Sequence, residues 1–356
     1  MKIGFDTRQA NVKGTGIGRY TFNIYTRLQK AGNPDIVFFK GPANKSNSFK
    51  DKLLVNFWEQ FILPFLLLFC RIKVFHITKN LGIPFVSTAR YIITIHDIIP
   101  LVMEKEYLQS TLKKLLYLIR LKWAVKRARI IIADSVHTKN DLIKYLGISE
   151  NKIKVIYLGI DNGFRVLVDI DMHCKIKQKY GIEKPFILGI GSNEPRKNAV
   201  RLIKAFQIFK EKYPSDIQLV IIGKPWLQQK CESICYNDVS FIGYVDEEDL
   251  VALYNCTEAF VFPSLYEGFG LPPLEAMACG APVITSNLSS LPELVGDSAV
   301  LIDPYNIEQI ADAIWRVISD KDFALLLKNK GLEHVRRFTW EKSIRELLEL
   351  YRECLN

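Results

Sequence analysis

Short apolar runs alternate with longer segments of helical pattern along the whole chain. The runs are rich in Ile, Val and Phe, as expected of parallel strands buried on both faces. Between them, apolar residues recur at spacings of three and four, which indicates amphipathic helices. The predicted strands are Lys2–Asp6, Ile36–Lys40, Val74–Ile77, Tyr91–His96, Arg129–Asp134, Lys154–Leu158, Pro185–Gly189, Gln218–Gly223, Ser240–Tyr244, Ala259–Pro263, Pro282–Thr285 and Ala299–Ile302.

The strand–helix series occurs twice, so we expect an α/β protein with two doubly wound, Rossmann-like domains. The segment 165–183 has a poor strand pattern, and a fresh strand begins at Pro185. We therefore assign residues 1–165 to the first domain and 166–339 to the second. Ligands of open α/β sheets bind beyond the carboxyl ends of the strands, so the expected site is a central cleft that both domains face.

Composition and charge narrow the class of protein. The chain has 356 residues, of which 49% are hydrophobic and 24% charged, as in globular proteins. Its seven cysteines are scattered, and the start, MKIGFDTRQA, has no signal-peptide features, so we expect a cytoplasmic protein. The net charge of +10 could favour binding to a nucleic acid, an anionic membrane or a phosphorylated substrate.

Two apolar segments bear on membrane contact. The run Phe61–Cys70 is about half the length of a membrane span, so we expect it to form a buried helix. The segment Lys113–Arg129 combines apolar residues at helical spacing with Lys126, Arg127 and other cations. Such a helix can lie on the anionic inner face of the plasma membrane, or it can pack one face into the core. Because no nucleic-acid motif accompanies the charge, nucleic acid is the weakest interpretation.

Two carboxylates, Glu267 and Glu275, flank the segment EGFGLPPLE, which follows the strand AFVFP. Gly268 and Gly270 let a backbone approach a ligand closely, and Pro273 suits the first position of a helix. The N–H groups at the start of that helix would favour a diphosphate. The carboxylates would hold sugar hydroxyls by charge-assisted hydrogen bonds, although Glu275 could simply complement the helix dipole.

The segment EGFGLPPLEAMACGAPVI resembles the E-x7-E signature of the retaining GT-B glycosyltransferases of family four, group 1, which include sucrose synthase and many bacterial lipopolysaccharide enzymes. The resemblance implies a GT-B fold whose last helix, within residues 340–356, crosses back to the first domain. It implies that Glu267 contacts the donor sugar and Glu275 the ribose of the nucleotide. It also implies that sugar and phosphate bind the backbone amides of Gly268, Phe269, Gly270 and Leu271.

A second polar segment, GIGSNEPRKN, follows a predicted strand. It places Arg196 and Lys197 beside the start of a predicted helix, Ala199–Tyr213, with Asn198 as its N-cap. Two cations beside free amides make a diphosphate site, although a solvated basic pair is the alternative. The family has an Arg and a Lys here as its diphosphate clamp, and the EPRKN form resembles its mannosyltransferase-like branch. The other donor-binding candidates in this segment are Gly191 and Ser192.

A glycine-rich turn, GTGIGRY, follows the first strand. It is not the G-x-G-x-x-G dinucleotide fingerprint, but such a turn before a helix still offers amides to a phosphate or an acceptor. The family has a loop of this kind across the cleft from the diphosphate. We therefore include Gly16 and Gly18, which follow Gly14, among the donor-binding candidates.

His96 and Asp97 end an apolar strand, which predicts a position at the cleft edge. A lone histidine is more often structural, and Asp97 would either fix its tautomer or cap the next turn. In the family, a histidine at this strand end approaches the donor sugar. His96 is therefore a catalytic candidate together with Arg196, Lys197 and Glu267.

Two acidic clusters could suggest a metal, but neither is expected to bind one. Asp169 and Asp171 have the D-x-D form, yet they lie in the predicted interdomain linker and not at a strand end. The run from Asp246 to Asp249 is typical of a helix N-terminus. We expect no metal site and no cofactor beyond the nucleotide-sugar donor.

Together these features predict metal-independent transfer of a hexose to a saccharide or lipid-linked saccharide acceptor, such as a growing O-antigen. The resemblance favours mannose, with GDP-mannose as the first donor to test. It implies retention of anomeric configuration, with the departing diphosphate oxygen accepting the acceptor proton and fixed positive charge stabilising that leaving group. The alternatives are a nucleotide-sugar epimerase of the same fold, a dinucleotide-dependent oxidoreductase and a non-catalytic nucleotide-binding module.

Overall fold

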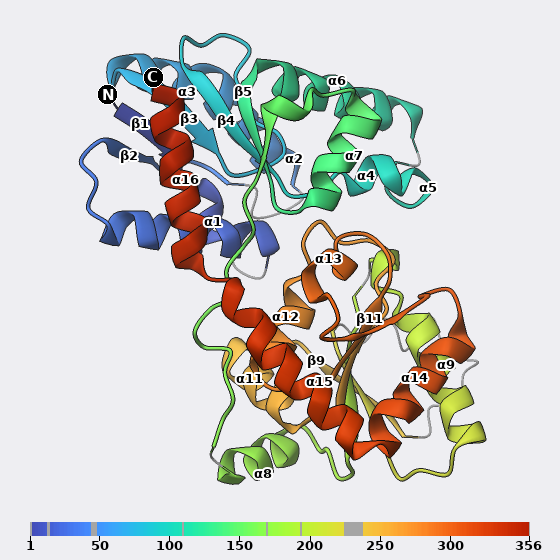
Figure 1. Ribbon diagram of the computed structural model, residues 1–356. Helices are drawn as coiled ribbons and strands as arrows, with labels where there is room; N and C mark the ends of the chain where they lie inside the picture. Colours follow the sequence, from blue (N-terminus) through green and yellow to red (C-terminus); the bar gives the residue numbers. More distant parts are fainter. Residues whose placement is uncertain are drawn as a thin grey trace. The chain divides into compact units, whose positions relative to one another are not determined.

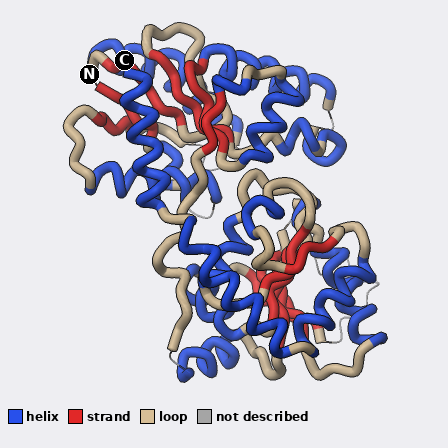
Figure 2. The backbone as a smooth tube through the Cα atoms, in the orientation of Figure 1, coloured by secondary structure: helices blue, strands red, loops and turns tan. Residues whose placement is uncertain are grey.

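The computed structural model divides into two compact units, each built on one parallel sheet (Figures 1 and 2). It describes residues 2–12, 15–43, 48–108, 110–168, 170–192, 194–223 and 238–355. Residues Met1–Gly159 and Thr339–Asn356 form the first unit, and Ile160–Phe338 form the second. The sequence predicts domain boundaries after residues 165 and 339, whereas the two units divide after Gly159 and after Phe338.

The first unit has six parallel strands in the order β2-β1-β3-β4-β5-β6. These strands are β1 (Lys2–Asp6), β2 (Ile36–Phe39), β3 (Ile72–Ile77), β4 (Arg90–Ile95), β5 (Ala128–Ala133) and β6 (Ile153–Val155). Its helices are η1 (Arg8–Asn11), α1 (Gly16–Lys30), α2 (Phe49–Phe57), η2 (Trp58–Ile62), α3 (Leu63–Phe69), α4 (Ile99–Val102), α5 (Glu104–Tyr107), α6 (Thr111–Arg127), α7 (Val136–Leu146), η3 (Glu150–Lys152) and α16 (Trp340–Leu355).

The second unit has the order β12-β11-β10-β7-β8-β9, again all parallel. Its strands are β7 (Phe186–Ile190), β8 (Gln218–Ile222), β9 (Val239–Gly243), β10 (Ala259–Phe262), β11 (Val283–Ser286) and β12 (Val300–Ile302). Its described helices are α8 (Ile170–Lys179), η4 (Pro195–Lys197), α9 (Ala199–Lys212), α11 (Glu247–Cys256), α12 (Leu271–Ala278), α13 (Leu291–Val295), α14 (Ile307–Ser319), α15 (Lys321–His334) and η5 (Val335–Arg337). The two-sheet α/β prediction is confirmed, and each of the twelve predicted strands overlaps an observed one.

Alternation along the strands sends side chains to both faces of the first sheet. On one face, His76 of β3 lies 2.7 Å from the hydroxyl of Tyr351 on α16 and 2.8 Å from Thr94 of β4. Tyr20 of α1 reaches the same Thr94 at 3.1 Å. Helices α3 and α6 pack into the apolar core of the opposite face. Both faces are therefore covered, as the apolar strand sequences require.

The last helix packs against the first unit through a close backbone crossing. The Ser343 hydroxyl donates to the carbonyl of Tyr157 at 2.6 Å. A Cβ atom at Gly159 would lie 2.2 Å from the backbone nitrogen of Trp340. Only glycine allows the chain to cross here, so Gly159 fixes how α16 returns to the first sheet.

The apolar run beginning near Phe61 is not the buried helix expected from the sequence. Residues of α2, η2 and α3 form one helical run, and only its inner side, with Leu63 and Leu67, is buried. Within the described residues, Lys50–Phe69 is long and apolar enough to cross a membrane by length and composition alone, and 28% of its most apolar window is buried. The outward side chains that are more than half exposed are Leu53, Leu54, Phe57, Phe61, Phe65, Leu68 and Phe69.

Helix α6 also directs apolar residues outward. Its C-terminal half contributes Leu121 and Ala124 to the core. Arg120 of α6 donates to the side chain of Asn56 on α2 at 3.2 Å, so the two partly exposed helices are neighbours. The apolar side chains of α6 that are more than half exposed are Leu112, Leu115, Leu116 and Ile119. We call these four, with the outward residues of α2 to α3, the apolar face.

Candidate functional site

Arg196, Lys197 and Glu267 form a buried ionic cluster in the second unit. Lys197 Nζ lies 2.8 Å from Glu267 Oε1, and Arg196 Nη1 lies 2.5 Å from Glu267 Oε2. Ser264 also donates to Glu267 Oε1 at 2.8 Å. The cations come from the turn after β7 and the carboxylate from the loop after β10, a neighbouring parallel strand. Strand order therefore brings together side chains that lie 70 residues apart in sequence.

Burial shapes the charges of this cluster. Burial by itself would raise the pKa of Glu267, but Lys197 and Arg196 hold that pKa below its ordinary value. Burial lowers the pKa of Lys197, and Glu267 only partly offsets the effect. The Lys197 ammonium also lies 4.7 Å from the centre of the Phe262 ring. The result is two cations held at fixed positions by two carboxylates, because Arg196 Nε also lies 2.5 Å from Glu194 Oε2.

Asn198 holds the turn that carries the two cations. It occupies the position before α9, as expected, but its side chain makes no capping hydrogen bond. Its backbone is left-handed, with φ of 58°, a conformation that Asn tolerates better than most residues. Its side-chain nitrogen donates to the carbonyls of Pro263 at 3.0 Å and Pro304 at 2.8 Å. Asn198 therefore ties the turn to the ends of β10 and β12.

The loop that carries Gly268 to Leu271 leads into the N-terminus of α12. Gly270 has φ of 118°, and a Cβ atom there would lie 2.7 Å from Leu291. Helix α12 begins at Leu271, so Pro272 and not Pro273 follows the first helical residue. Because prolines lack an N–H, the first turn offers fewer amides than an ordinary helix. An anion bound here would depend more on the loop amides and on the cationic cluster than on the first turn of α12.

The remaining donor-side candidates also lie in the second unit. Glu275 is buried in α12, with 3% of its surface exposed. Phe269 is buried too, and its ring packs edge-on against Phe338. Gly191 follows β7, and a Cβ atom on it would lie 2.9 Å from Ile221. The hydroxyl of Ser192 accepts a bond from the amide of Glu194 at 3.2 Å, which shapes the turn before Arg196.

His96 lies at the carboxyl edge of the first sheet, but its partner is not the one considered from the sequence. Its Nδ1 lies 2.5 Å from Asp134 Oδ2, and its Nε2 lies 3.1 Å from the carbonyl of Thr78. Asp97 instead caps the next turn by accepting from the amide of Ile99 at 3.1 Å. Asp134 directly follows β5, beside β4, so its place at the end of the predicted strand Arg129–Asp134 was the available signal.

The two partners of His96 indicate its protonation state. A carboxylate and a backbone carbonyl can only accept, so both ring nitrogens must donate and the imidazole is a cation. Burial would lower the pKa of His96, but Asp134 outweighs it and raises that pKa above its ordinary value. In this arrangement His96 has no free nitrogen with which to act as a base.

The glycine-rich turn of the first unit is only partly described, because Gly14 lies outside the described residues. Thr15 caps α1 by accepting from the amide of Gly18 at 3.0 Å, so that amide is already used. A Cβ atom on Gly18 would lie 2.1 Å from the carbonyl of Val12, which explains the glycine. A Cβ atom on Gly16 would meet nothing within 4 Å. Of the two described glycines of this turn, Gly18 is the one that close packing requires.

A buried ion network near this edge was not anticipated. Arg8 pairs with Asp6 at 2.6 Å and with Glu59 at 2.9 Å, and Lys79 pairs with Glu59 at 2.5 Å. Arg8 also lies over the ring of Trp58, 4.5 Å from its centre. The network joins the ends of β1 and β3 to η2. It therefore anchors the helical run 49–69, whose outer side is exposed.

The acidic clusters have no metal-binding arrangement in the described part of the chain. No group of three His, Cys, Asp or Glu side chains there could hold a metal ion. Asp169 of the D-x-D pair lies outside the described residues. Asp246 caps α11 by accepting from the amide of Asp249 at 3.0 Å, which confirms the predicted helix N-terminus.

Comparison with known proteins assigns the family. The model "Glycosyltransferase Family 4" matches residues 14–164, and the model "Glycosyl transferases group 1" matches residues 174–337. Together these matches span most of both units. The chain belongs to the family four, group 1 glycosyltransferases.

Two mannosyltransferases of Escherichia coli match this glycosyltransferase to different extents. Serotype-specific mannosyltransferase WbdA of Escherichia coli is 31% identical to this chain in a match that covers 73% of this chain and 33% of that protein. The matched region thus spans about a third of the length of that relative. O-antigen chain mannosyltransferase B of Escherichia coli is 29% identical over 99% of this chain and 100% of that protein.

A solved structure supports the fold of the glycosyltransferase. The sucrose-phosphate synthase from Thermosynechococcus elongatus has a TM-score of 0.77 and 20% identity. The match covers 100% of this chain and 99% of that one. The likeness establishes the GT-B fold predicted from the sequence.

The role of Asn198 gives a stability prediction for this glycosyltransferase. Asn198→Ala removes two hydrogen bonds to backbone carbonyls and strains a left-handed position, so the unfolding free energy should fall by about 3 kcal/mol. Asn198→Gly should recover about 1 kcal/mol of this loss. Asn306→Ala, at an ordinary N-cap of α14, should cost only about 1 kcal/mol. Urea unfolding measures all three, and equal losses at the two asparagines would contradict the assigned role.

The His96–Asp134 pair gives a pH prediction. A raised pKa in the folded protein adds stability that is complete below the unfolded value of about 6.5 and is lost as pH rises through the folded value. Asp134→Asn removes the cause of the raised pKa. Its unfolding free energy should therefore vary less than that of wild type between about pH 6 and pH 9. An NMR titration of His96 provides the direct check, and an unchanged pKa in the variant would refute the pairing.

Proposed function

We propose that this chain transfers mannose from a nucleotide diphosphate sugar, with GDP-mannose the first candidate, to a growing lipid-linked surface polysaccharide such as O-antigen. We further propose that the transfer retains the anomeric configuration and needs no metal. The choice of mannose and of an O-antigen acceptor is supported by the names of the two Escherichia coli relatives, a serotype-specific mannosyltransferase and an O-antigen chain mannosyltransferase. It also fits the resemblance of the EPRKN segment to the mannosyltransferase-like branch.

The observation that carries this proposal is the convergence of Arg196 and Lys197 on Glu267. A diphosphate carries negative charge that grows as the bond to the sugar breaks. Arg and Lys side chains held at fixed positions stabilise such charge without reorganising during the reaction. Because Glu267 now accepts from both cations, a bound diphosphate would take over part of this pairing. The Glu267 carboxylate would then become available for a hydroxyl of the donor sugar.

The first unit bears on which group accepts the proton of the acceptor hydroxyl. Both ring nitrogens of His96 donate hydrogen bonds, so His96 would act through its positive charge and not as a catalytic base. We propose that the departing diphosphate oxygen takes the proton of the acceptor hydroxyl on the same face of the sugar. New and broken bonds on one face retain the configuration. In this scheme Glu275 binds the ribose, and the 268–271 amides bind phosphate.

The clamp role predicts a large loss from a single substitution. Arg196→Ala should lower the transfer rate by about two to three orders of magnitude, because the leaving diphosphate loses a fixed cation. Arg196→Lys should retain part of the rate. The control is Arg336→Ala, which removes an exposed arginine of the same unit. A rate for Arg196→Ala within a few fold of wild type would refute the clamp.

We also propose that the enzyme works in the cytoplasm, in peripheral contact with the anionic inner leaflet. The apolar face of α2 to α3 and α6 supports this, since exposed apolar patches commonly mark contact surfaces. Lys113, Lys114 and Lys122 lie on the same helix α6, so apolar and cationic groups are interleaved. A bilayer with anionic headgroups matches both kinds of group.

Vesicle binding tests the membrane contact. Replacing Lys126, Arg127 and Arg129 with Gln should weaken binding to phosphatidylglycerol vesicles on the order of a hundredfold, at about 1 kcal/mol per cation. Replacing Phe61 and Phe69 with Ser should weaken it as well, by removing exposed apolar surface.

The matched control for this test is Phe22→Ser, which removes an exposed phenylalanine from α1, away from the apolar face. Its vesicle binding should equal that of wild type. Cosedimentation measures all the variants. Unchanged binding in both the charge and the apolar variants would remove the proposed membrane contact.

A further inference from the structure

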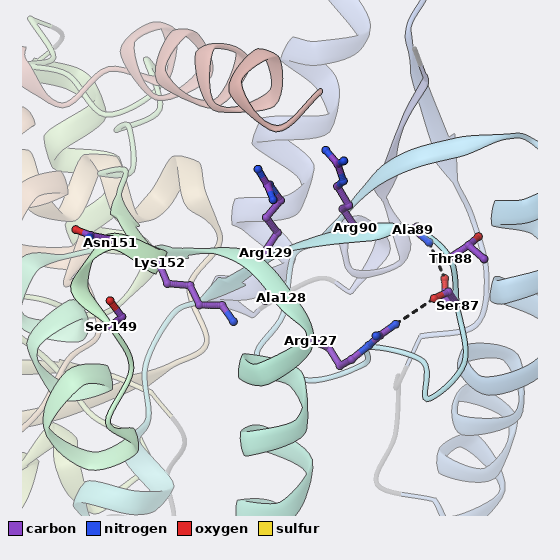
Figure 3. Close-up of a pocket in the computed structure, with 10 residues that line it drawn as sticks. All are labelled: Ser87, Thr88, Ala89, Arg90, Arg127, Ala128, Arg129, Ser149, Asn151 and Lys152. Carbon is purple, nitrogen blue, oxygen red and sulfur yellow. Dashed lines mark hydrogen bonds between the residues drawn. The ribbon is translucent and has the colours of Figure 1, made fainter. Parts of the chain in front are cut away.

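A cationic cavity lies at the amino edge of the first sheet, where β4 and β5 begin. Its volume is about 640 Å³, within the usual range for small-molecule sites. Figure 3 shows Arg90 and Arg129 extending side by side from the first residues of these strands. The lining side chains that matter here are Ser87, Arg90, Arg127, Arg129, Asn151 and Lys152.

No acidic side chain lines this cavity. Four of its ten lining residues are cationic. Within the described residues, three of the four cations donate to backbone carbonyls: Arg90 to Cys354, Arg127 to Ser87 and Lys152 to Lys126, at 3.0 to 3.2 Å. No salt bridge joins these four side chains to a carboxylate in the described part. Like charges this close repel, so an anion would relieve the repulsion.

The remaining donors suit a particular kind of anion. Each guanidinium has five N–H groups in a planar fork that matches phosphate oxygens, and most of these groups are unused here. Partial burial also lowers the pKa of Lys152, as expected of an amine without a counterion. A compact, multiply charged group such as phosphate or diphosphate would meet several of these donors at once.

The cavity is separate from the edge that carries His96. Arg90 begins β4 and His96 follows its end, so about 20 Å of strand separates them. An apolar rim lies beside the cavity, because Phe85 and Val86 precede Ser87 and are 60% and 79% exposed. The ring of Phe85 lies 5.3 Å from that of Trp123 on α6, the helix that ends at Arg127.

We propose that this cavity is an anion-binding site for a phosphate or diphosphate group, distinct from the donor site. Arg90 and Arg129 bind the phosphate oxygens, and Arg127 and Lys152, which point to the other side of the two strands, add to the positive potential. The group comes either from a lipid headgroup, whose chains would lie along Phe85 and Val86, or from a soluble phosphate compound.

Calorimetric titration with pyrophosphate tests the site in the full chain. An Arg196→Gln background suppresses binding at the proposed donor clamp, so the two sites are measured apart. Adding Arg90→Gln and Arg129→Gln should weaken the remaining pyrophosphate binding at least tenfold. The matched control adds Lys30→Gln and Lys40→Gln, which remove two exposed cations of the same unit, and should leave binding unchanged. Thermal unfolding verifies that all variants are folded.

A second arm identifies the source of the phosphate. Arg90→Gln, a position outside the vesicle test above, is compared in the otherwise wild-type chain on phosphatidylglycerol and phosphatidylcholine vesicles. Loss of binding to the anionic vesicles assigns a lipid headgroup, whereas loss of pyrophosphate binding alone assigns a soluble phosphate. Unchanged binding in both arms, or an equal loss in the Lys30 and Lys40 control, overturns the proposal.

Discussion

The pairing of Glu267 with Arg196 and Lys197 is the interaction on which the second unit's site depends. Two buried cations without a counterion would be costly, and Glu267 supplies that counterion from a neighbouring strand end. Asn198 then holds the cationic turn in place through two backbone carbonyls. The same arrangement that makes the cluster stable keeps both cations at fixed positions, which is the property a departing diphosphate requires.

The first unit uses its sheet differently at the two edges. At the carboxyl edge, charges are paired: His96 with Asp134, and Arg8 with Asp6 and Glu59. At the amino edge, the cationic cavity has no acidic lining residue. Paired charges suit a preorganised reaction edge, whereas unpaired cations suit the capture of an anion from outside. The outward apolar residues of α2 to α3 and α6 add a surface of a third kind.

Much of the fold could be predicted because each strand is a continuous apolar run. Such runs are typical of parallel strands that are covered on both faces. The cluster residues were also predictable, since glycines, prolines and paired charges follow strands. The Asp134 partner of His96 was not found, because a contact across 38 residues depends on strand order. The run Phe61–Cys70 was expected in the core because hydrophobicity shows that a segment avoids water, not whether protein or another apolar phase covers it. Asn198 was assigned a capping role from its position, whereas its left-handed backbone directs the side chain elsewhere.

The central claim is retaining, metal-independent sugar transfer driven by stabilisation of the leaving diphosphate. The most direct test follows GDP-mannose labelled at the anomeric carbon by NMR, with the enzyme and a chelator and without acceptor. Slow hydrolysis should first release mannose with the anomeric configuration of the donor, before mutarotation mixes the two forms. First release of the opposite anomer, or hydrolysis that stops when the chelator is added, would contradict the account.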